Sequence, residues 1–133
     1  MNERKSRIIL QQGGQVLMAR DHSGRITFLG DHIEEGETAV EAAIRVVEGD
    51  ANMKIGHHTS NLVELPSQDS DPELLWHWFS IDIPPEEEIN VEPRGNVVEL
   101  FWITLEQVEH YVTYEDWKHH WTKCLLPALL SIT

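Results

Sequence analysis

Acidic side chains gather in one short stretch of this 133-residue chain, between residues 29 and 53. They occupy the loop before a predicted helix, the helix itself and its end, and are Asp31, Glu34, Glu35, Glu37, Glu41, Glu48 and Asp50. Carboxylate oxygens are ligands that magnesium prefers, usually one or two of them together with phosphate oxygens and water. A divalent cation bound in this way can neutralise phosphate charge and activate a water molecule. Metal-assisted chemistry on a phosphate is therefore the first chemistry to consider for this stretch.

The middle of the stretch predicts an amphipathic helix. Gly36 ends the preceding loop, and Glu37 and Thr38 open the first turn, which is a common start signal. Apolar residues then recur at the spacing of a buried helical stripe, at Val40, Ala43, Ile44 and Val47. Gly49 and Asp50 end the helix, and Asn52 suits a left-handed C-cap.

A helical wheel at about 100° per residue separates two further faces. One face is a solvated charged stripe, formed by Glu37, Glu41, Arg45 and Glu48. The next face carries small or apolar residues and a single acid, at Ala39, Ala42, Val46, Gly49 and Asp50. Asp50 is thus the one candidate metal ligand on that second face.

Residues 31–53 resemble the Nudix box of the Nudix hydrolase superfamily, whose pattern is G-x5-E-x7-R-E-U-x-E-E-x-G-U with U aliphatic. The positions that match are the first glutamate, the arginine, two aliphatic residues and two accompanying glycines, namely Glu37, Arg45, Val47, Met53, Gly30 and Gly36. The resemblance implies that Glu37 and Arg45 form the ion pair that ties the loop to the helix. It also implies a site for Mg²⁺ or Mn²⁺ that serves to cut a nucleoside diphosphate linked to another group.

The departures from the pattern fall on the positions that would hold the metal. Val46 replaces the glutamate after the arginine, and Gly49 and Asp50 replace the glutamate pair. Asp31 and Asn52 replace the first and last glycines. The resemblance thus implies a Nudix scaffold whose metal site is degenerate.

The surrounding chain fits the order of a Nudix domain. A β-hairpin is predicted over residues 7–20 about Gly13-Gly14, followed by a turn at 21–24 and a short strand at 25–29. After the helix, residues 54–65 are interpreted as a strand region with a polar middle, and residues 66–72 as a loop or hairpin turn. Residues 114–132 predict a helical region that Pro127 kinks or divides. Its apolar stripe is Trp117, Trp121, Leu125 and Leu126 with Tyr114.

A second resemblance lies in residues 96–108, where many Nudix domains have a strand with a glutamate shortly before a tryptophan, followed by a short helix. Glu99 and Trp102 fit that order, and Thr104 is a plausible N-cap. Because a glutamate of this region can serve relatives as a metal ligand or base, Glu99 is the candidate outside the helix. By strand alternation alone, Glu99 could equally be an outward residue of an edge strand.

Residues 74–83 predict an aromatic strand with two different faces. Trp76 and Trp78 share one face, and they could stack a nucleotide base. Alternatively the pair packs beneath a helix, as large aromatic residues more often do.

The eight histidines show no HExxH or similar chelating spacing. His57-His58 and His119-His120 are adjacent pairs, whose side chains are expected to diverge on a strand or a helix. His32 in the acidic loop could add a nitrogen ligand. Surface or core positions are the default interpretation of all eight.

Composition restricts the partners. The net charge of −13 argues against a nucleic acid and against an anionic membrane. A single cysteine, Cys124, excludes an internal disulfide and suits a reducing, cytoplasmic compartment. The apolar arc of the central helix together with the two tryptophans would permit a homodimer.

The sequence as a whole predicts one Nudix-like domain over residues 1–133, an α/β/α sandwich with a mixed β-sheet, a central helix and a long C-terminal helix. Three functions remain open. The first is a nucleotide-binding member with little or no activity, and the second is an active hydrolase with a rearranged site built from Glu37, Asp50 and Glu99, with Glu34 or Glu48. The third is a non-catalytic protein-interaction domain. Glu37, Arg45, Asp50 and Glu99 are the predicted catalytic residues, Asp50 and Glu99 the predicted metal ligands, and Trp76 and Trp78 the predicted substrate-binding residues.

Overall fold

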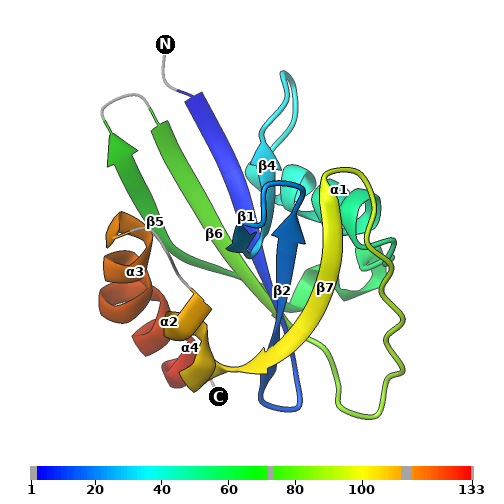
Figure 1. Cartoon of the computed structure of the whole chain (residues 1–133). Coiled ribbons are helices and arrows are strands. Elements are labelled where there is room, and N and C mark those ends of the chain that lie inside the picture. Colours follow the sequence, from blue (N-terminus) through cyan, green and yellow to red (C-terminus); the bar gives the residue numbers. More distant parts are fainter. Residues whose placement is uncertain (1–2, 72–73, 112–114, 133) are drawn as a thin grey trace.

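The computed structural model describes residues 3–71, 74–111 and 115–132. Its centre is a mixed β-sheet, with one helix against one face and the C-terminal helices against the other (Figure 1). This arrangement confirms the predicted layers of helix, mixed sheet and helix. No helix in the described ranges is both long enough and apolar enough to cross a bilayer.

Seven strands form the sheet within the described residues: β1 (Glu3–Gln12), β2 (Gln15–Asp21), β3 (Ile26–Thr27), β4 (Leu29–His32), β5 (Leu62–Asp71), β6 (Leu74–Asp82) and β7 (Val97–Thr104). The main path runs β3-β2-β1-β6-β5, while β4 pairs with β1 and β7 pairs with β2. Among the strands of the described residues, only β1 and β6 are paired in parallel. On its other edge β1 pairs with β4 along its first half and with β2 at its last two residues, so the sheet divides between β4 and β2.

The predicted hairpin is confirmed. β1 and β2 pair at Gln11–Val16 and Gln12–Gln15, about a Gly13-Gly14 turn. Both glycines have positive φ, 58° and 79°, which is the conformation that a two-residue hairpin turn of this kind requires.

Helix α1 (Ala39–Asp50) begins slightly later than predicted, because Thr38, which was expected in the first turn, is the N-cap. Thr38 Oγ1 accepts a hydrogen bond from the Glu41 N–H at 3.0 Å, and Glu41 Oε1 accepts one from the Thr38 N–H at 2.9 Å. This reciprocal pair satisfies two backbone donors that the helix start would otherwise leave free. Asn52 follows the helix with a φ of 53°, as predicted for a left-handed cap.

The buried side of α1 is rotated relative to the predicted stripe. Ala43 and Val47 are buried as expected, but Val40 and Ile44 are only partly buried. The remaining core positions are Ala42 and Val46, which belong to the face assigned above to small and apolar residues. Val46, at a position where the Nudix box has a glutamate, therefore packs in the core.

Alternating residues of the central strands supply two separate cores. Against α1 lie Ile8, Leu10, Leu17, Phe79 and Ile81, and against the C-terminal helices lie Ile9, Val16, Met18, Trp78 and Trp121. Successive side chains of a strand point to opposite faces, so each strand feeds both cores. The predicted alternation of the aromatic strand, now β6, is confirmed.

Two predictions between α1 and β6 are wrong. Residues 56–61 form a 3₁₀ helix, η1 (Gly56–Asn61), in place of the middle of a strand. Residues 66–71 belong to β5 and not to a loop, and the β5–β6 register shifts between Leu65 and Gln68. Pro66 lies at that irregularity of an edge strand, one of the few sheet positions that tolerate proline.

Beyond β7 the chain is helical, in η2 (Leu105–Gln107), α2 (Val108–Tyr111), α3 (Glu115–His120), a π-helical turn η3 (Trp121–Leu125) and α4 (Leu126–Ile132). The predicted disturbance at Pro127 is present, because the π-helical turn ends directly before it and the Leu126 N–H bonds to Trp121 O. Proline lacks a backbone N–H, so the regular helical bond from residue 127 is missing. Trp121 and Leu125 are buried as predicted, whereas Tyr114 and the side chain of Trp117 lie outside the described residues.

Candidate functional site

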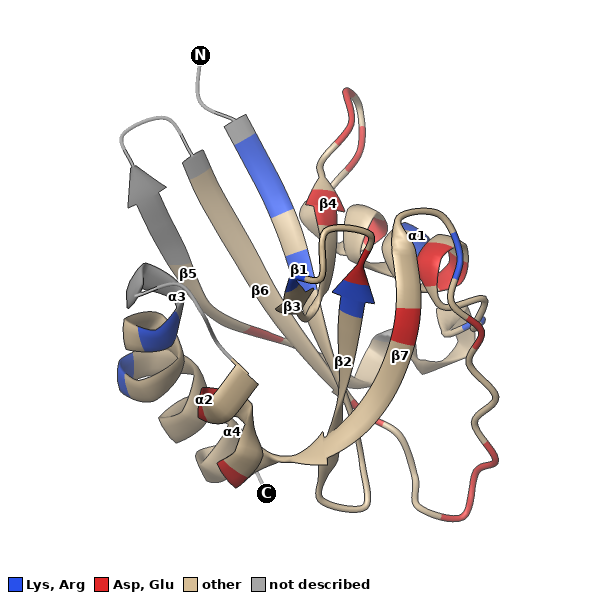
Figure 2. Ribbon diagram, in the orientation of Figure 1, with Lys and Arg blue, Asp and Glu red and all other residues tan. Residues whose placement is uncertain are grey.

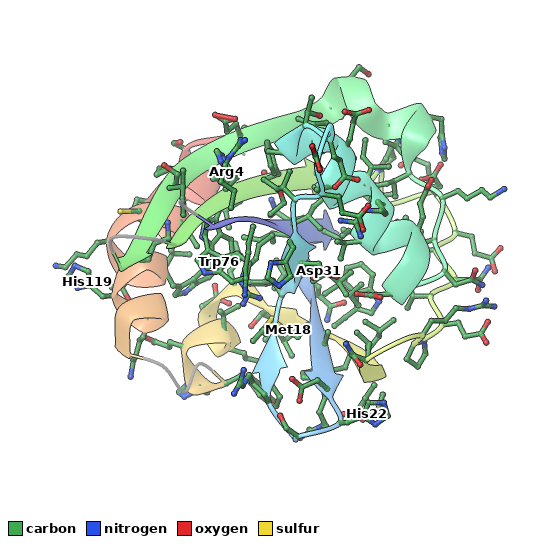
Figure 3. The ribbon with its side chains drawn as sticks, turned by 90° about the horizontal axis from the view of Figure 1, so that it is seen from above. Arg4, Met18, His22, Asp31, Trp76 and His119 are labelled. Atoms are coloured by element: carbon green, nitrogen blue, oxygen red, sulfur yellow. The ribbon has the colours of Figure 1, made fainter. Side chains whose placement is uncertain are left out.

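A pocket of about 370 Å³ lies where the sheet divides between β4 and β2. Its lining comes from β1, the β2–β4 region, the end of α1, Trp76 of β6 and the start of β7, and includes Lys5, Arg7, Asp21, Arg25, Gly30, Asp31, Asp50, Trp76 and Asn96. Residues that are distant in sequence meet here because β1 pairs with both β4 and β6. Figure 3 labels Trp76 and Asp31, which lie in the interior of the view on neighbouring parts of the sheet.

One wall of the pocket is cationic and aromatic. The Arg7 guanidinium carbon lies 4.0 Å from the centre of the Trp76 ring, and Lys5 Nζ lies 5.1 Å from it. Arg7 also donates a hydrogen bond to Phe28 O at 2.8 Å, whereas its buried Nε has no partner among the described residues. Burial, helped by Arg25, lowers the pKa of Arg7 to about 10, so the guanidinium remains charged at neutral pH. This wall, which we call the Arg7–Trp76 wall, suits an anionic group.

Gly30 allows this wall to form. It pairs with Arg7 across the β1–β4 ladder, and a Cβ at Gly30 would lie 2.6 Å from Arg7 Cγ and 2.8 Å from Ser6 O. Real carbon atoms do not approach so closely, and only glycine permits the two strands to lie at this separation. Glycine is favoured at position 36 for a different reason. Its φ of 80° suits glycine, whereas a Cβ at Gly36 would meet nothing within 4 Å.

The opposite wall is acidic and contains Asp31 and Asp50. Burial, together with the nearby charge of Asp31, raises the pKa of Asp50, while Arg45 acts in the other direction. Two carboxylates that repel each other are a plausible partial site for a divalent cation, whose charge would relieve that repulsion. Val46 and Gly49 offer no oxygen ligand from their side chains, and Asp50 is the residue of α1 that lines the pocket. Figure 2 shows the separation of charge, with basic residues along β1 and acidic residues on β4, its following loop and α1.

Asp21 lines the same pocket but is held in a turn. Its carboxylate accepts hydrogen bonds from Ser23 Oγ at 2.6 Å and from the Ser23 and Arg25 N–H groups at 2.9 and 3.0 Å. The Ser23 hydroxyl is the main cause that lowers the pKa of Asp21. These bonds fix the carboxylate and keep it ionised at the mouth of the pocket.

The expected ion pair between loop and helix is present. Arg45 Nε and Nη2 donate to Glu37 Oε2 and Oε1 at 2.8 and 3.1 Å, and Arg45 Nη2 also donates to His32 O at 2.8 Å. The hydrogen bond from Arg45 lowers the pKa of Glu37 and raises that of Arg45. A planar guanidinium that binds a carboxylate and a backbone carbonyl together holds the acidic loop against α1. Neither residue lines the pocket, and Glu34 and Glu48 do not line it either.

Glu99 lies on β7 opposite Arg20 of β2, and Arg20 Nε donates to Glu99 Oε1 at 2.8 Å. Both side chains are about half exposed, at 41% and 53%, and neither lines the pocket. Ala19 and Asp21, the neighbours of Arg20 in β2, do line the pocket. Because side chains alternate along a strand, Arg20 and its partner Glu99 lie on the opposite face of the sheet. The structure therefore separates Glu99 from Asp50, and its role as a metal ligand stays a prediction.

The two tryptophans of β6 have different surroundings. Trp76 lines the pocket, but Trp78 is completely buried in the core against the C-terminal helices. Trp78 packs edge-on against Phe28, with ring centres 5.9 Å apart, and near His120. Phe28 and the C-terminal helices cover the Trp78 ring, so the structure gives no support to its predicted stacking on a base. The alternative of packing beneath a helix applies to it.

Lys5, Arg7 and Asp21 were not singled out from the sequence. The signal for the first two was available, since Lys5 and Arg7 are two residues apart and so share one face of the predicted strand. Their partner Trp76 lies some seventy positions away in the sequence. The parallel β1–β6 register that brings it opposite Lys5 is a tertiary feature.

Comparison with known proteins agrees with this geometry. Residues 2–125 match the NUDIX domain family. The fold is similar to that of a bifunctional NMN adenylyltransferase/ADP ribose pyrophosphatase from Francisella tularensis, complexed with AMP and Mn ion, with a TM-score of 0.80, 12% identity, and coverage of 98% of this chain and 42% of that chain. It is also similar to a C. elegans Ap4A hydrolase in a binary complex, with a TM-score of 0.71, 16% identity and coverage of 97% and 99%.

A third similar structure is the E. coli dihydroneopterin triphosphate pyrophosphohydrolase, with a TM-score of 0.69, 15% identity and coverage of 89% of this chain and 91% of that chain. A comparison with curated protein sequences finds no match. The chain spans less than half the length of the Francisella protein. At these identities the similar structures show the fold alone, whereas the family match extends over most of the sequence, and the chain therefore belongs to the Nudix family.

Proposed function

We propose that this Nudix-family protein binds a nucleotide-type small molecule in the pocket and hydrolyses it weakly or not at all. The observation that supports binding is the Arg7–Trp76 wall, where a charged guanidinium lies 4.0 Å above an aromatic ring with Lys5 beside it. Arg7 is partly buried and lines the pocket, and a charged guanidinium at such a place favours a phosphate oxygen as its partner. Trp76 remains the proposed substrate-binding aromatic residue because it lines the pocket, whereas the buried Trp78 does not.

The acidic wall supports weak hydrolysis. Family enzymes generally use divalent metals, and here Asp50, with Asp31, would hold Mg²⁺ or Mn²⁺. The positions of Val46 and Gly49 carry no carboxylate, and Val46 is buried in the core. Magnesium is bound weakly by so few carboxylates because it gives up its water reluctantly. A bound cation would supply charge neutralisation and an activated water, and Glu37 and Arg45 would hold the loop that follows Asp31 and β4.

Ligand-dependent thermal stabilisation tests the binding. A panel of nucleoside diphosphate derivatives is added with Mg²⁺ or Mn²⁺, and melting is followed together with phosphate release. We expect stabilisation by at least one compound, and at least about tenfold weaker binding by Arg7→Met, since a charged hydrogen bond contributes about 1.5–3 kcal/mol. Arg4→Met is the matched control, because Arg4 points to the other face of β1, where it donates to His77. Equal losses in both variants, or no stabilisation by any compound, would overturn the proposal.

An active hydrolase with a rearranged site is the second candidate. The observation that favours it is that Asp31 and Asp50 line the same pocket, where burial and, after it, the charge of Asp31 raise the pKa of Asp50. Magnesium- or manganese-dependent turnover that is lost in Asp50→Ala and Glu99→Gln would establish it. Turnover that survives Glu99→Gln and fails with Asp50→Ala would assign the metal to the pocket alone.

A cytoplasmic location and a homodimer remain part of the proposal. The oligomeric state is measured by light scattering after gel filtration. A chain that neither binds nor cuts any nucleotide would leave the protein-interaction domain as the remaining function.

A further inference from the structure

A second group of possible metal ligands lies outside the pocket. His57 and His58 of η1 and Glu87 of the segment after β6 each offer one atom, and these three atoms lie within 4.8 Å of one another. The His58 Nε2 atom is 2.6 Å from Glu87 Oε2, and the His57 Nε2 atom is 3.6 Å from Glu87 Oε1. None of the three residues lines the pocket.

The adjacent histidines converge, contrary to the expectation from sequence. Their ring centres are 4.0 Å apart, although neighbouring residues of a 3₁₀ helix point about 120° apart. Both Nε2 atoms face the same carboxylate. The other adjacent pair does not converge on an acid, because His120 Nε2 bonds to Pro66 O at 2.9 Å. Convergence at His57 and His58 is thus a property of this place in the fold.

The segments that carry the three ligands are fixed by the sheet. Gln12 Nε2 donates to Glu87 O at 2.7 Å and to Pro84 O at 2.8 Å, which anchors the acidic segment to the end of β1. The His58 N–H donates to the O atom of Ile55, a fully buried residue. His58 is itself buried, with 10% of its side chain exposed, while His57 is 62% exposed and free to adjust.

We propose that His57, His58 and Glu87 bind a zinc ion. Two imidazoles and one carboxylate form a ligand set that zinc uses in proteins. In such sites the protein supplies three ligands and a water molecule supplies the fourth. Zinc–ligand distances of about 2.0–2.1 Å place tetrahedral ligand atoms roughly 3.3 Å apart. To reach that value the His58–Glu87 distance of 2.6 Å must lengthen and the wider spacings, of up to 4.8 Å, must shorten. Rotations of the partly exposed Glu87 side chain and of the exposed His57 ring supply both movements. Imidazole nitrogen favours zinc over magnesium, which distinguishes this site from the carboxylate wall of the pocket.

Isothermal titration with Zn²⁺, and Co²⁺ as a visible-absorption probe, tests the site in the full chain. We expect saturable binding of one ion, with affinity reduced at least about tenfold in His57→Ala and in Glu87→Gln, since loss even of a supporting residue around a metal costs 10–100-fold. His119→Ala is the matched control, because it removes the exposed histidine of the other pair, at the periphery in Figure 3. Asp50→Asn is the second control and leaves zinc binding unchanged.

Each result decides the proposal. No saturable zinc binding by the wild-type chain, or equal binding by wild type and His57→Ala, overturns it. A loss of binding in Asp50→Asn would move the zinc to the pocket and also overturn it. Melting temperatures measured without metal show that His57→Ala is folded, since this side chain is largely exposed.

Discussion

Replacing Gly30 by alanine perturbs the fold and the pocket through one added methyl group. The new Cβ would lie 2.6 Å from Arg7 Cγ, 2.8 Å from Ser6 O and 3.3 Å from Arg7 Cα, against 3.4–4 Å for ordinary contacts. Two of these atoms are backbone, so β4 must move away from β1. Inserting a methyl group into such a packed position costs about 1–3 kcal/mol.

Thermal melting measures this cost. For a chain of 133 residues, about 1–3 kcal/mol corresponds to a fall in melting temperature of about 4–11 °C. Gly49→Ala is the matched control, because a Cβ at Gly49 meets nothing within 4 Å inside helix α1. Alanine is a better helix former than glycine by about 0.5–1 kcal/mol, so the same substitution should stabilise there.

Ligand binding supplies the second readout of Gly30→Ala. Moving β4 displaces Arg7 from its place 4.0 Å above the Trp76 ring, so nucleotide stabilisation should decrease along with the melting temperature. A Gly30→Ala protein that melts within about 1 °C of wild type would refute the reasoning, because it would show that β1 and β4 separate at no cost.

Three further predictions concern the walls of the pocket and the core. Asp50→Asn should stabilise the protein near neutral pH, and this gain should vanish in acid below about pH 4. The reason is that the raised pKa of Asp50 means that folding disfavours its charged form, which is absent in acid. Trp78→Ala should lower the free energy of unfolding in urea by about 3–5 kcal/mol, since the ring is fully buried against Phe28. Gly49→Glu should raise Mn²⁺ affinity roughly tenfold, measured by titration, because it adds a carboxylate beside Asp50 at a position with open space.

Each of these has a contradicting outcome. A stability gain of Asp50→Asn that grows on acidification would show that folding favours the charged form of the Asp50 carboxylate. Trp78→Ala with less than about 1 kcal/mol of destabilisation would contradict the packing described for β6. Unchanged Mn²⁺ affinity in Gly49→Glu would show that this end of α1 does not direct side chains toward the cation.

The elements with strong local signals were predicted from the sequence. The Gly13-Gly14 hairpin, the start of α1 (expected at Glu37 and found at Ala39) and the alternation of β6 all depend on residues a few positions apart. The errors lie between α1 and β6, where local signals conflict. The run at 57–61 is polar and became the 3₁₀ helix η1, and Pro66 was taken as a loop residue although an edge strand accommodates it.

Within the candidate site, the ion pair of Glu37 and Arg45 followed from the motif because both residues belong to one loop and one helix. Asp50 was predicted to be the acid remaining from the box, and it lines the pocket. Glu99 was matched by its order in the chain, but order does not specify which face of β7 a side chain occupies.

The sequence by itself determined the family, the hairpin, the central helix and the single acid, Asp50, on one face of that helix, since each depends on residue types at short spacing. The tertiary structure alone decided that Arg7 lies over Trp76, that Trp78 is enclosed and that His57 and His58 converge on Glu87. These results depend on the pairing of β1 with both β4 and β6 and on the anchoring of the acidic segment by Gln12. Such pairings join residues far apart in the chain, and their register is fixed by burial of the whole sheet and not by any local pattern.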